Sequence, residues 1–464
     1  MTDSRQRIAI IGGGPGGYVA AIRAAQLGAQ VSLIEKDQLG GTCLNRGCVP
    51  TKYLIHATSI FRQAQLAHNF GIKISELSVD FPEMMKRKQA VIRQLQSGIE
   101  YLMDKNKIKV YQGTGTIFRP GKIRVTGETE TLIEVDKIII ATGSEPASLP
   151  IEGASGKGVI FNSEGLELQL PPSSLIIIGG GVIGIEFAQI FQRLNTKVAI
   201  IEMMPNILPN EDIEITDVLA EELQAGGTGI YTGARVLNIG DTRGKKKTVT
   251  FETQNGSQEL TAKIILMAVG RRPFIQDSGV TELGIASGKN GKIYVNNYLE
   301  TNVPGIYAVG DVLGGSMLAH VAMAEGVCAA ENAMGMTKEM NYNVIPRCVY
   351  ASPEVAAVGL TEAEAKAKYS NIKVGNFPLV GNSKAVIIGE TTGMVKIIAE
   401  AKYNQLLGVS IIGPHATELI AEAALAIKLE VTLDELIATI HAHPTLSEAI
   451  MEAGLNGEGR GIHY

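Results

Sequence analysis

One pattern of glycines and acids occurs twice along this chain and constrains its fold more than any other feature. Residues 7–35 run from the apolar stretch RIAIIGGGPGG through a helical pattern to a second apolar stretch that ends on Glu35. Residues 174–202 repeat this order and end on Glu202. In each copy the first glycine lies 23 residues before the acid. The duplication predicts two strand–helix–strand units and therefore an α/β fold.

Each copy also carries a glycine fingerprint at the predicted strand-to-helix turn. The glycines are Gly12, Gly14 and Gly17 in the first copy and Gly179, Gly181 and Gly184 in the second. Small residues there let the backbone approach a pyrophosphate at a helix N-terminus, whose partial positive charge attracts it. The acid after the next strand can accept a bond from an adenosine ribose 2′-hydroxyl. We therefore predict two dinucleotide-binding units, with two ordinary strand–helix–strand turns as the alternative.

The rest of the chain divides around these two units. Late in each unit a buried strand ends in a glycine turn, at KIIIATGSEP (137–146) and at KIILMAVGRRP (263–273). The first unit is the longer one and so carries an insert. From roughly residue 343 onward no fingerprint appears, and alternating strands accompany the apolar-faced helix of ATELIAEAALAIKLE. We expect a separate α+β domain there, with an apolar face that another subunit can cover.

Composition and charge exclude several classes of function. The 464 residues, 45% of them hydrophobic, can bury several cores, and the net charge of −5 leaves no basic surface for nucleic acid. The lysine-rich run 245–247 indicates a solvated hairpin end. The longest apolar run, 175–185, is interrupted by Glu186 and is shorter than the about 20 residues of a membrane helix. With no secretory apolar core at its start, the chain is expected to be intracellular and cytoplasmic, without a membrane partner.

Two of the four cysteines, Cys43 and Cys48, lie close together in LGGTCLNRGCVPTKYL. A zinc site would need a second Cys or His pair at a suitable spacing, and a structural disulfide does not suit an intracellular chain. A reversible disulfide is therefore favoured, with two inert buried cysteines as the alternative. Pro50 indicates that a helix begins here, which places Cys48 at its positive end with Lys52 one turn on. Both effects lower the pKa of a thiol.

One acid follows a further buried strand. In TNVPGIYAVGDV, residues 301–312, the strand delivers Asp311 to a turn flanked by glycine. Its carboxylate can bond ribityl or ribose hydroxyls of a flavin dinucleotide, or it can be the N-cap of the following helix. Both interpretations remain open from the residues alone.

Several motifs together resemble one enzyme family. The segment GGTCLNRGCVPTK, the two fingerprints, ATGSEP, YAVGDV and the C-terminal HAHPTLSEA follow the order typical of the flavoprotein pyridine nucleotide-disulfide oxidoreductases, over nearly the whole chain. Within this family the chain is most similar to the enzymes that oxidise dihydrolipoamide. The resemblance implies that dihydrolipoamide and NAD⁺ give lipoamide and NADH through FAD and a Cys43–Cys48 disulfide. It also implies a homodimer that serves the lipoyl domains of 2-oxoacid dehydrogenase or glycine cleavage complexes.

The resemblance also divides the chain into domains. It implies an FAD-binding domain at 1–148 that is completed by 271–342, an NAD-binding domain at 149–270 and an interface domain at 343–464. The expected fold class is then α/β, with two Rossmann-like dinucleotide-binding domains and a C-terminal α+β domain that forms the dimer.

Residue roles follow from the same resemblance. Cys43 resembles the cysteine that forms a mixed disulfide with substrate, and Cys48 the one that faces the flavin in a charge-transfer complex. Lys52 and Glu186 resemble the ion pair beside the reactive end of the flavin. FAD contacts are expected from Gly12, Gly14, Pro15, Gly17, Glu35, Lys36, Gly41, Thr42, Lys52, Gly115, Ala141, Thr142, Gly143, Asp311, Met317, Leu318, Ala319 and His320. NAD contacts are expected from Gly179, Gly181, Gly184, Glu202, Val269 and Gly270, and no metal is expected.

The segment HAHPTLSEA, residues 441–449, is expected to supply a base, because a dithiol must lose a proton before it attacks a disulfide. Histidine suits that task near neutral pH. The resemblance assigns the base to His443, with Glu448 as its partner, and implies that the ring reaches the disulfide of the other subunit. The alternative is a loop at His443 followed by a capping box of Thr445 and Glu448 at the start of the next helix.

Sister enzymes are the main alternatives. A mercuric reductase-like chain would carry a C-terminal cysteine pair, whereas this sequence ends in GRGIHY. Soluble transhydrogenases lack the complete cysteine pair. A glutathione reductase-like enzyme shares the architecture, but HAHPTLSE and Glu202 favour dihydrolipoamide and NAD. A non-catalytic flavin-binding scaffold is a further alternative, which flavin reduction by dihydrolipoamide would exclude.

Overall fold

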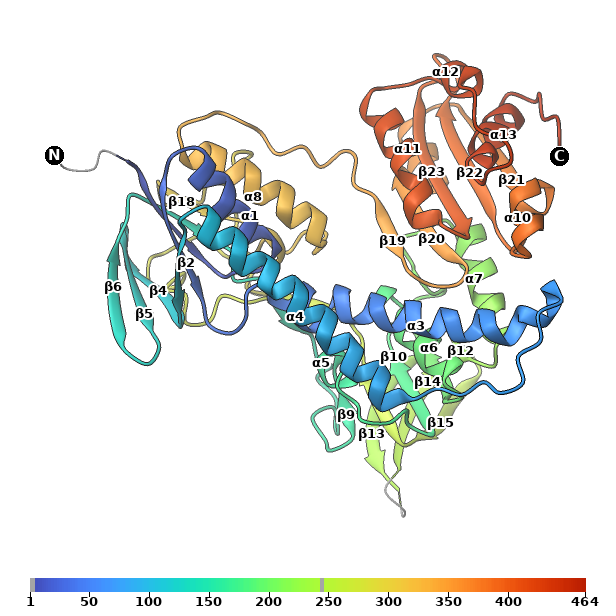
Figure 1. The fold of residues 1–464 in the computed structure, drawn as a ribbon, viewed down its shortest axis with the longest axis horizontal. Coiled ribbons are helices and arrows are strands. Elements are labelled where there is room, and N and C mark those ends of the chain that lie inside the picture. The colour runs from blue at the N-terminus through green and yellow to red at the C-terminus, as the bar shows by residue number, and fades with distance from the viewer. Residues whose placement is uncertain (1–4, 243–245) are drawn as a thin grey trace.

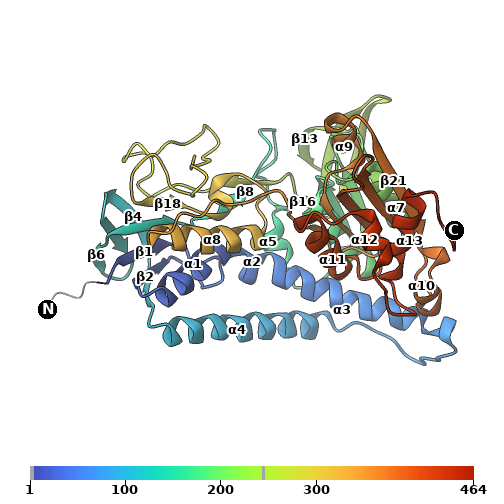
Figure 2. The same cartoon turned by 90° about the horizontal axis from the view of Figure 1, so that it is seen from above.

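The computed structural model describes residues 5–242 and 246–464. Within these residues, three sheets have five strands each, and each forms the centre of one lobe of the molecule (Figure 1). The fold class is α/β, as predicted. Helices α3 (Cys48–Leu66) and α4 (Phe81–Lys105) lie side by side and run from the first lobe to the second (Figure 2). None of the described helices is long and apolar enough to cross a membrane.

The first sheet has the parallel strand order β18-β7-β1-β2-β3. Its strands are β1 (Arg7–Ile11), β2 (Gln30–Glu35), β3 (Lys109–Gln112), β7 (Lys137–Ile140) and β18 (Ile306–Ala308). Ile8, Ala9 and Ile10 are all fully buried, so both faces of the sheet are covered, as is usual for parallel strands. Helix α1 (Pro15–Gln26) packs on α8 (Ala319–Ala333), so a segment from late in the chain completes this lobe.

The predicted insert of the first unit lies between β2 and β7. This segment contains α2 (Gly41–Arg46), α3, η1 (Ala67–Phe70), α4 and an antiparallel sheet of β4 (Thr114–Arg119), β5 (Lys122–Thr126) and β6 (Glu130–Glu134). The second unit also has a helix and a three-stranded antiparallel sheet in the corresponding segment, so the insert itself consists of α2, α3 and η1. The helix predicted from Pro50 is confirmed as α3, which begins at Cys48. Cys43 lies in the short helix α2, so the two cysteines are on consecutive helices separated by Gly47.

The second sheet repeats the arrangement of the first, with strand order β12-β11-β10-β16-β9. Its strands are β9 (Val159–Ile160), β10 (Ser174–Ile178), β11 (Lys197–Ile201), β12 (Gly229–Tyr231) and β16 (Ile264–Met267). Ile178 pairs with Ile201 as Ile11 pairs with Ile34, so the acid follows at the same place in both units. This lobe also contains α5 (Asn162–Gly165), α6 (Val182–Arg193), α7 (Ile213–Ala225) and the antiparallel strands β13 (Arg235–Asp241), β14 (Lys247–Thr253) and β15 (Gly256–Ala262).

A two-stranded antiparallel ribbon joins the first two lobes. Its strands, β8 (Ser144–Pro146) and β17 (Arg271–Pro273), each follow a glycine turn that the sequence singles out. The ribbon therefore brings the turn at Gly143 and the turn at Gly270 to the same region of the molecule.

The third sheet forms the C-terminal lobe and is antiparallel, with strand order β19-β20-β23-β22-β21. Its strands are β19 (Arg347–Val349), β20 (Glu354–Gly359), β21 (Ile372–Pro378), β22 (Met394–Glu400) and β23 (Leu406–Gly413). The lobe also has α9 (Glu362–Lys368), η3 (Leu379–Gly381), α10 (Ser383–Ile388), α11 (Ala416–Lys428), α12 (Leu433–Ala438) and α13 (Glu448–Gly457). This is the α+β domain expected from roughly residue 343 onward. The domain boundaries themselves stay a proposal.

The lysine-rich run differs from its prediction. Lys245 lies outside the described residues. Lys247 begins β14 and is buried, and its Nζ lies 2.7 Å from Asp241 Oδ1. The expectation of a solvated position is therefore wrong for Lys247, because the pairing of β13 with β14 places this charge opposite a carboxylate.

Candidate active site

One cavity of about 2070 Å³ lies between the two glycine units and reaches the C-terminal lobe. It is larger than the roughly 300–1,000 Å³ of a usual ligand pocket, so it can accept more than one extended ligand. All of the predicted FAD and NAD contacts line it except Gly17 and Gly184, and Cys43, Cys48 and Glu186 line it as well. The fold thus brings together site residues that are far apart in the sequence.

Gly17 and Gly184 lie beneath the cavity wall and have a packing role. A Cβ at Gly17 would lie 1.8 Å from the Gly12 carbonyl oxygen, and a Cβ at Gly184 would lie 2.0 Å from that of Gly179. Only glycine therefore lets the helix begin this close to the strand that precedes it. The first helical turn of each unit is held against the cavity as a result.

The two acids hold the glycine turns in the same way. Glu35 accepts hydrogen bonds from the N–H groups of Gly13 (2.7 Å) and Asp37 (2.8 Å). Glu202 accepts them from Gly180 (2.5 Å) and Met204 (2.7 Å). Burial raises the pKa of Glu35, although the bond from the Gly13 N–H and the charge of Lys36 oppose the rise. Each carboxylate keeps lone pairs for a ribose hydroxyl, because two oxygens can accept about four hydrogen bonds.

The space above the second glycine of each fingerprint fits a dinucleotide. Among the described residues, a Cβ at Gly181 would meet no atom within 4 Å, and a Cβ at Gly14 would meet only the Gly41 Cα, at 3.9 Å. Both glycines line the cavity at a helix N-terminus. A pyrophosphate can therefore approach the backbone here, and the helix dipole would attract it.

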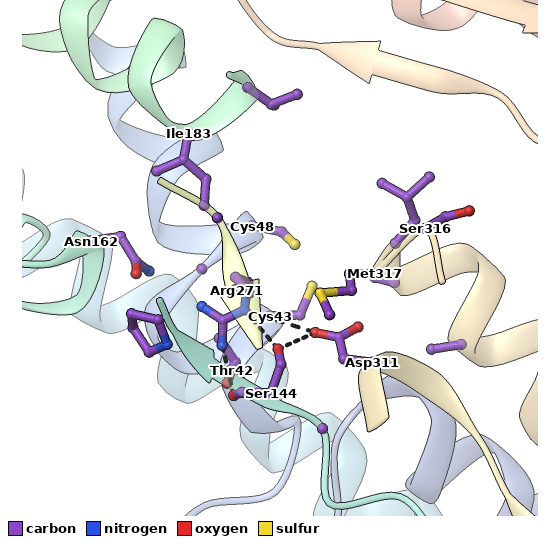
Figure 3. A pocket seen from close by; sticks show the side chains of 18 of the residues that line it. Thr42, Cys43, Cys48, Ser144, Asn162, Ile183, Arg271, Asp311, Ser316 and Met317 are labelled. Carbon is purple, nitrogen blue, oxygen red and sulfur yellow. Dashed lines mark hydrogen bonds and ion pairs between the residues drawn. The ribbon is translucent and has the colours of Figure 1, made fainter. Parts of the chain in front are cut away.

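The two cysteines are free thiols on one wall of the cavity (Figure 3). Cys48 is exposed to the cavity, and Cys43 is half-buried. The hydrogen bond from the Cys43 thiol lowers the pKa of Cys48 to about 7, and Lys52 lowers it too, against the effects of burial and of Glu186. The same hydrogen bond and burial raise the pKa of Cys43. Cys48 is therefore the member of the pair that exists as a thiolate near neutral pH.

Lys52 and Glu186 join the two units next to the cysteines. The Lys52 Nζ lies 2.8 Å from Glu186 Oε1 and 3.0 Å from Oε2, and α3 and α6 carry the two residues. Burial opposes the charge on Lys52, but the attraction of Glu186 and its hydrogen bond raise the pKa above the ordinary value. Lys52 therefore keeps its positive charge beside Cys48.

Asp311 is held by two residues of the ribbon between the lobes (Figure 3). Its carboxylate accepts a hydrogen bond from the Ser144 hydroxyl and lies 3.8 Å from Arg271 Nε. Arg271 also donates to the Ser144 hydroxyl at 2.7 Å. Asp311 lies in the first turn of η2 (Gly310–Leu313), whose N-cap is Val309, so the alternative that Asp311 is a helix N-cap is wrong.

His443 and Glu448 lie together but away from the cysteines. The His443 Nδ1 is 3.0 Å from Glu448 Oε1, and Glu448 Oε2 accepts the Thr445 N–H at 2.8 Å. Burial opposes the charge on Glu448, but the bonds from Thr445 and His443 lower its pKa. The His443 side chain is 69% exposed, and neither residue lines the cavity. The expected capping box is incomplete, because α13 begins at Glu448 with Ser447 as its N-cap, and the Thr445 hydroxyl donates to the Ala442 carbonyl oxygen.

Comparison with known proteins identifies the family. Residues 6–326 match the family described as pyridine nucleotide-disulphide oxidoreductase, and residues 345–454 match its dimerisation domain. The chain belongs to the pyridine nucleotide-disulphide oxidoreductases. The predicted family is thereby confirmed. Domains of pyridine nucleotide-disulphide oxidoreductases bind FAD and NAD, as predicted here for the two units, and the second match supports a homodimer.

Individual members of the family are similar to this oxidoreductase over nearly their whole length. It is 43% identical to dihydrolipoyl dehydrogenase of Bacillus subtilis, with 98% of this chain and 99% of the relative covered. Its structure is similar to LpdA from Mycobacterium tuberculosis, with a TM-score of 0.90, 29% identity and coverage of 97% and 99%. It is also similar to the HOCl-induced flavoprotein disulfide reductase RclA from Escherichia coli, with a TM-score of 0.86, 28% identity and coverage of 98% and 99%.

Sequence reasoning missed several residues of this site. Ser144 and Arg271 line the cavity and contact Asp311, and each directly follows a glycine turn that the sequence singles out. That position was an available signal. Tyr350 also lines the cavity and lies over Lys52, with 4.7 Å from the Lys52 Nζ to the centroid of its ring. No sequence signal points to Tyr350, because its place depends on how the C-terminal lobe packs.

Proposed function

We propose that this oxidoreductase oxidises dihydrolipoamide to lipoamide and reduces NAD⁺ to NADH, through FAD and the Cys43–Cys48 pair. One observation carries the proposal: the pair, with a thiolate favoured at Cys48, opens into a cavity that contains two dinucleotide cradles. Similarity to the dihydrolipoyl dehydrogenase of B. subtilis supports the choice of substrate.

The first glycine unit, with Asp311, would hold FAD, and the second unit, with Glu202, would hold NAD. When bound, FAD accepts an electron pair from a dithiol and passes it to NAD⁺ as hydride. The residues of this chain position the groups on both sides of that transfer. Lys52 and Glu186 would fix a charge next to Cys48, and the ribbon of β8 and β17 would orient Asp311.

The substrate half of the reaction is a thiol–disulfide exchange. A substrate thiolate attacks the Cys43 sulfur, so a substrate–Cys43 bond forms while the Cys43–Cys48 bond breaks and Cys48 leaves as a thiolate. The second substrate thiol then attacks the substrate sulfur of this mixed disulfide. The lipoamide ring closes, and Cys43 leaves and takes a proton. The substrate loses two electrons and two protons, and the cysteine pair gains the two electrons.

His443 would accept the proton of the attacking thiol, and Glu448 would orient the ring. In one chain the His443 ring does not line the cavity that holds Cys43. We therefore propose that it serves the disulfide of a partner subunit. A homodimer supports this, since residues 345–454 match a dimerisation domain and contain His443.

The proposed partners are the lipoyl domains of 2-oxoacid dehydrogenase or glycine cleavage complexes, and the proposed location is the cytoplasm. A second candidate is a flavoprotein disulfide reductase that acts in the opposite direction on another disulfide. The similarity to RclA, at a TM-score of 0.86, favours this candidate. Steady-state rates with dihydrolipoamide and NAD⁺, compared with those for NADH and glutathione disulfide, separate the two.

The central test is an anaerobic titration of the purified holoprotein with dihydrolipoamide. We expect one equivalent to reduce the protein by two electrons and to produce a long-wavelength absorbance band from the Cys48 thiolate beside oxidised flavin. Cys43→Ser should show this band without any reductant, because Cys48 remains, and Cys48→Ser should never show it. Bands in both variants, or in neither, would reject the assignment of the two cysteines.

Complementation tests the role of His443. Homodimers of Cys48→Ser and of His443→Ala are each expected to be inactive. When they are unfolded and refolded together, hybrids should have one complete site of two and regain activity. If mixed dimers form but remain as inactive as their parents, a base from the partner subunit is excluded.

A further inference from the structure

The C-terminal lobe contacts the Lys52–Glu186 pair through the strand β19 and the residues that follow it. The Tyr350 N–H donates to Glu186 Oε1 at 3.2 Å, on the same oxygen that lies 2.8 Å from Lys52 Nζ. The ring of Tyr350 faces the other end of the pair, with its centroid 4.7 Å from Lys52 Nζ. One residue thus contacts both the carboxylate and the ammonium group.

The backbone around Tyr350 is fixed to the second unit on both sides. Arg347 donates to Glu211 at 2.8 and 3.0 Å, and the Gln189 side chain donates to the Ser352 carbonyl oxygen at 2.9 Å. Val349 and Ala351 are buried in the core of the second lobe. Because side chains alternate along an extended chain, Tyr350 must then point the other way, into the cavity.

We propose that Tyr350 is a positioning residue that holds the Lys52–Glu186 pair beside Cys48 from the C-terminal lobe. Its ring attracts the ammonium group by a cation–π interaction, which restricts where Lys52 can point. Its N–H occupies a lone pair of Glu186 and so fixes the carboxylate that Lys52 contacts. This role rests on the proposed function, because it assumes that the charge of Lys52 matters for the reactive thiolate.

The titratable groups around Cys48 come from several elements. The groups that act on Cys48 directly are Cys43 on α2, Lys52 on α3, Glu186 on α6 and Arg271 on β17. Those that act on Lys52 from the C-terminal lobe are Cys348 in β19 and Tyr350 directly after it. Burial raises the pKa of Tyr350, so its hydroxyl stays neutral where Cys48 titrates. The ring face, and not a phenolate charge, is therefore the part of Tyr350 that stabilises Lys52.

The test measures the titration of Cys48 in the Cys43→Ser holoprotein by ultraviolet thiolate absorbance, with Cys43→Ser/Cys48→Ser as the blank. Adding Tyr350→Leu should lower the acid dissociation constant of the Cys48 thiol about threefold, which raises its titration midpoint by about half a pH unit. Adding Tyr350→Phe keeps the ring and should leave the midpoint unchanged. If Tyr350→Leu also leaves it unchanged, or if Phe shifts it as far as Leu does, the proposal is overturned.

Two further variants test whether the effect of Tyr350 on Cys48 depends on Lys52, and provide a substitute in case Tyr350→Leu does not fold. In a Lys52→Met background, Tyr350→Leu should cause no additional shift, because the group it positions is gone. A shift that persists there would contradict the proposal. Gln189→Leu removes the anchor at Ser352 and should raise the midpoint in the same direction by less. It replaces Tyr350→Leu if thermal unfolding shows that the latter does not fold, and an unchanged midpoint would then count against the proposal.

The same samples distinguish this inference from the proposed function. Absence of the long-wavelength band from the Cys43→Ser holoprotein would overturn the proposed orientation of Cys48 toward the flavin. The ultraviolet midpoints do not depend on that orientation, so they still decide whether Tyr350 positions Lys52.

Discussion

The two glycine units have the same backbone, but different structures lie above them. In both, the third glycine packs on the carbonyl of the first, and the acid accepts two backbone N–H bonds. Above the first unit, Gly41 lies so close that a Cβ on it would be 2.7 Å from the Gly14 Cα. In the second unit, no atom of the described residues lies within 4 Å of the place that a Cβ on Gly181 would take. One architecture thus forms a covered site and an open one.

The helix that begins at the first site is itself held in place by a helix from late in the chain. Helix α1 of the first unit is closely covered by α8, where a Cβ on Gly326 would be 2.4 Å from the Gly16 carbonyl oxygen. Arg23 and Glu331 form an ion pair between these two helices. The covered site suits a cofactor that stays bound, and the open site suits one that exchanges in each turnover. This difference supports FAD in the first unit and NAD in the second.

The largest effect is expected where the units are alike, at the third glycine. Gly17→Ala and Gly184→Ala would each force a methyl group against a backbone carbonyl, at 1.8 and 2.0 Å. Overpacking of this kind costs about 3 kcal/mol at its upper end, so both variants should unfold at clearly lower denaturant concentration. Urea unfolding of the two holoproteins measures the cost.

The matched control is Gly28→Ala, at a glycine where no atom of the described residues lies within 4 Å of a Cβ. Its positive φ of 95° predicts a smaller loss, from backbone strain alone. A large loss in only one of the two fingerprint variants would show that the units are not packed equivalently.

The next largest effect is expected where the units differ. Gly41→Ala would place a methyl group against Gly14, and the φ of 57° at Gly41 is unfavourable for any residue except glycine. The segment that carries Gly41 over the first site must therefore move. We expect this variant to be purified with less than half of its FAD, as measured by flavin absorbance per protein. Gly181→Ala should keep its FAD, because its methyl group has open space around it, and should instead raise the KM for NAD⁺ about tenfold by occupying space for the pyrophosphate. The reverse pattern would mean that the two cofactors are assigned to the wrong units.

The sequence predicted those features that depend on short segments of chain. The fingerprints, the acids 23 residues further on and the helix that places Lys52 one turn after Cys48 are all local patterns, and the fold contains each of them. Their physical basis, the period of a helix and the conformational freedom of glycine, acts over a few residues. The pairing of Lys52 with Glu186 was predicted only from the resemblance to a known family, and not from a local pattern.

Features that depend on the meeting of distant segments could not be predicted in this way. The contact of Asp311 with Ser144 and Arg271 requires the ribbon in which Arg271 pairs with Pro146. Tyr350 reaches Lys52 only because β19 is fixed to the second lobe. Lys247 is buried because β13 and β14 pair in a register that the lysine-rich run does not specify.

A moderate effect is expected from the acid of the open site. Glu202 should repel a 2′-phosphate, so we expect at least about a tenfold preference for NAD⁺ over NADP⁺, or about 1.4 kcal/mol. Glu202→Gln removes the charge and should reduce this preference about threefold or more. Glu35→Gln is the matched control, because it makes the same change in the covered site and should leave the preference unchanged. Equal kcat/KM for the two nucleotides in the unaltered protein would refute the role of Glu202.

The smallest effect concerns the residue after each acid. The first unit has Lys36 there, whereas the second has Met203, a residue that is 66% exposed and lines the cavity at the open site. Met203→Lys should therefore not disturb packing, and it adds a cation near the place of a 2′-phosphate. Exposed charge pairs contribute about 0.2–1 kcal/mol, so kcat/KM for NADP⁺ should rise about threefold while that for NAD⁺ stays the same. Met203→Gln is the neutral control of similar length. The gain should vanish at about 1 M salt, where charges are screened within about 3 Å. A gain that persists there, or that the Gln variant shares, would mean that shape and not charge sets the nucleotide preference of the open site.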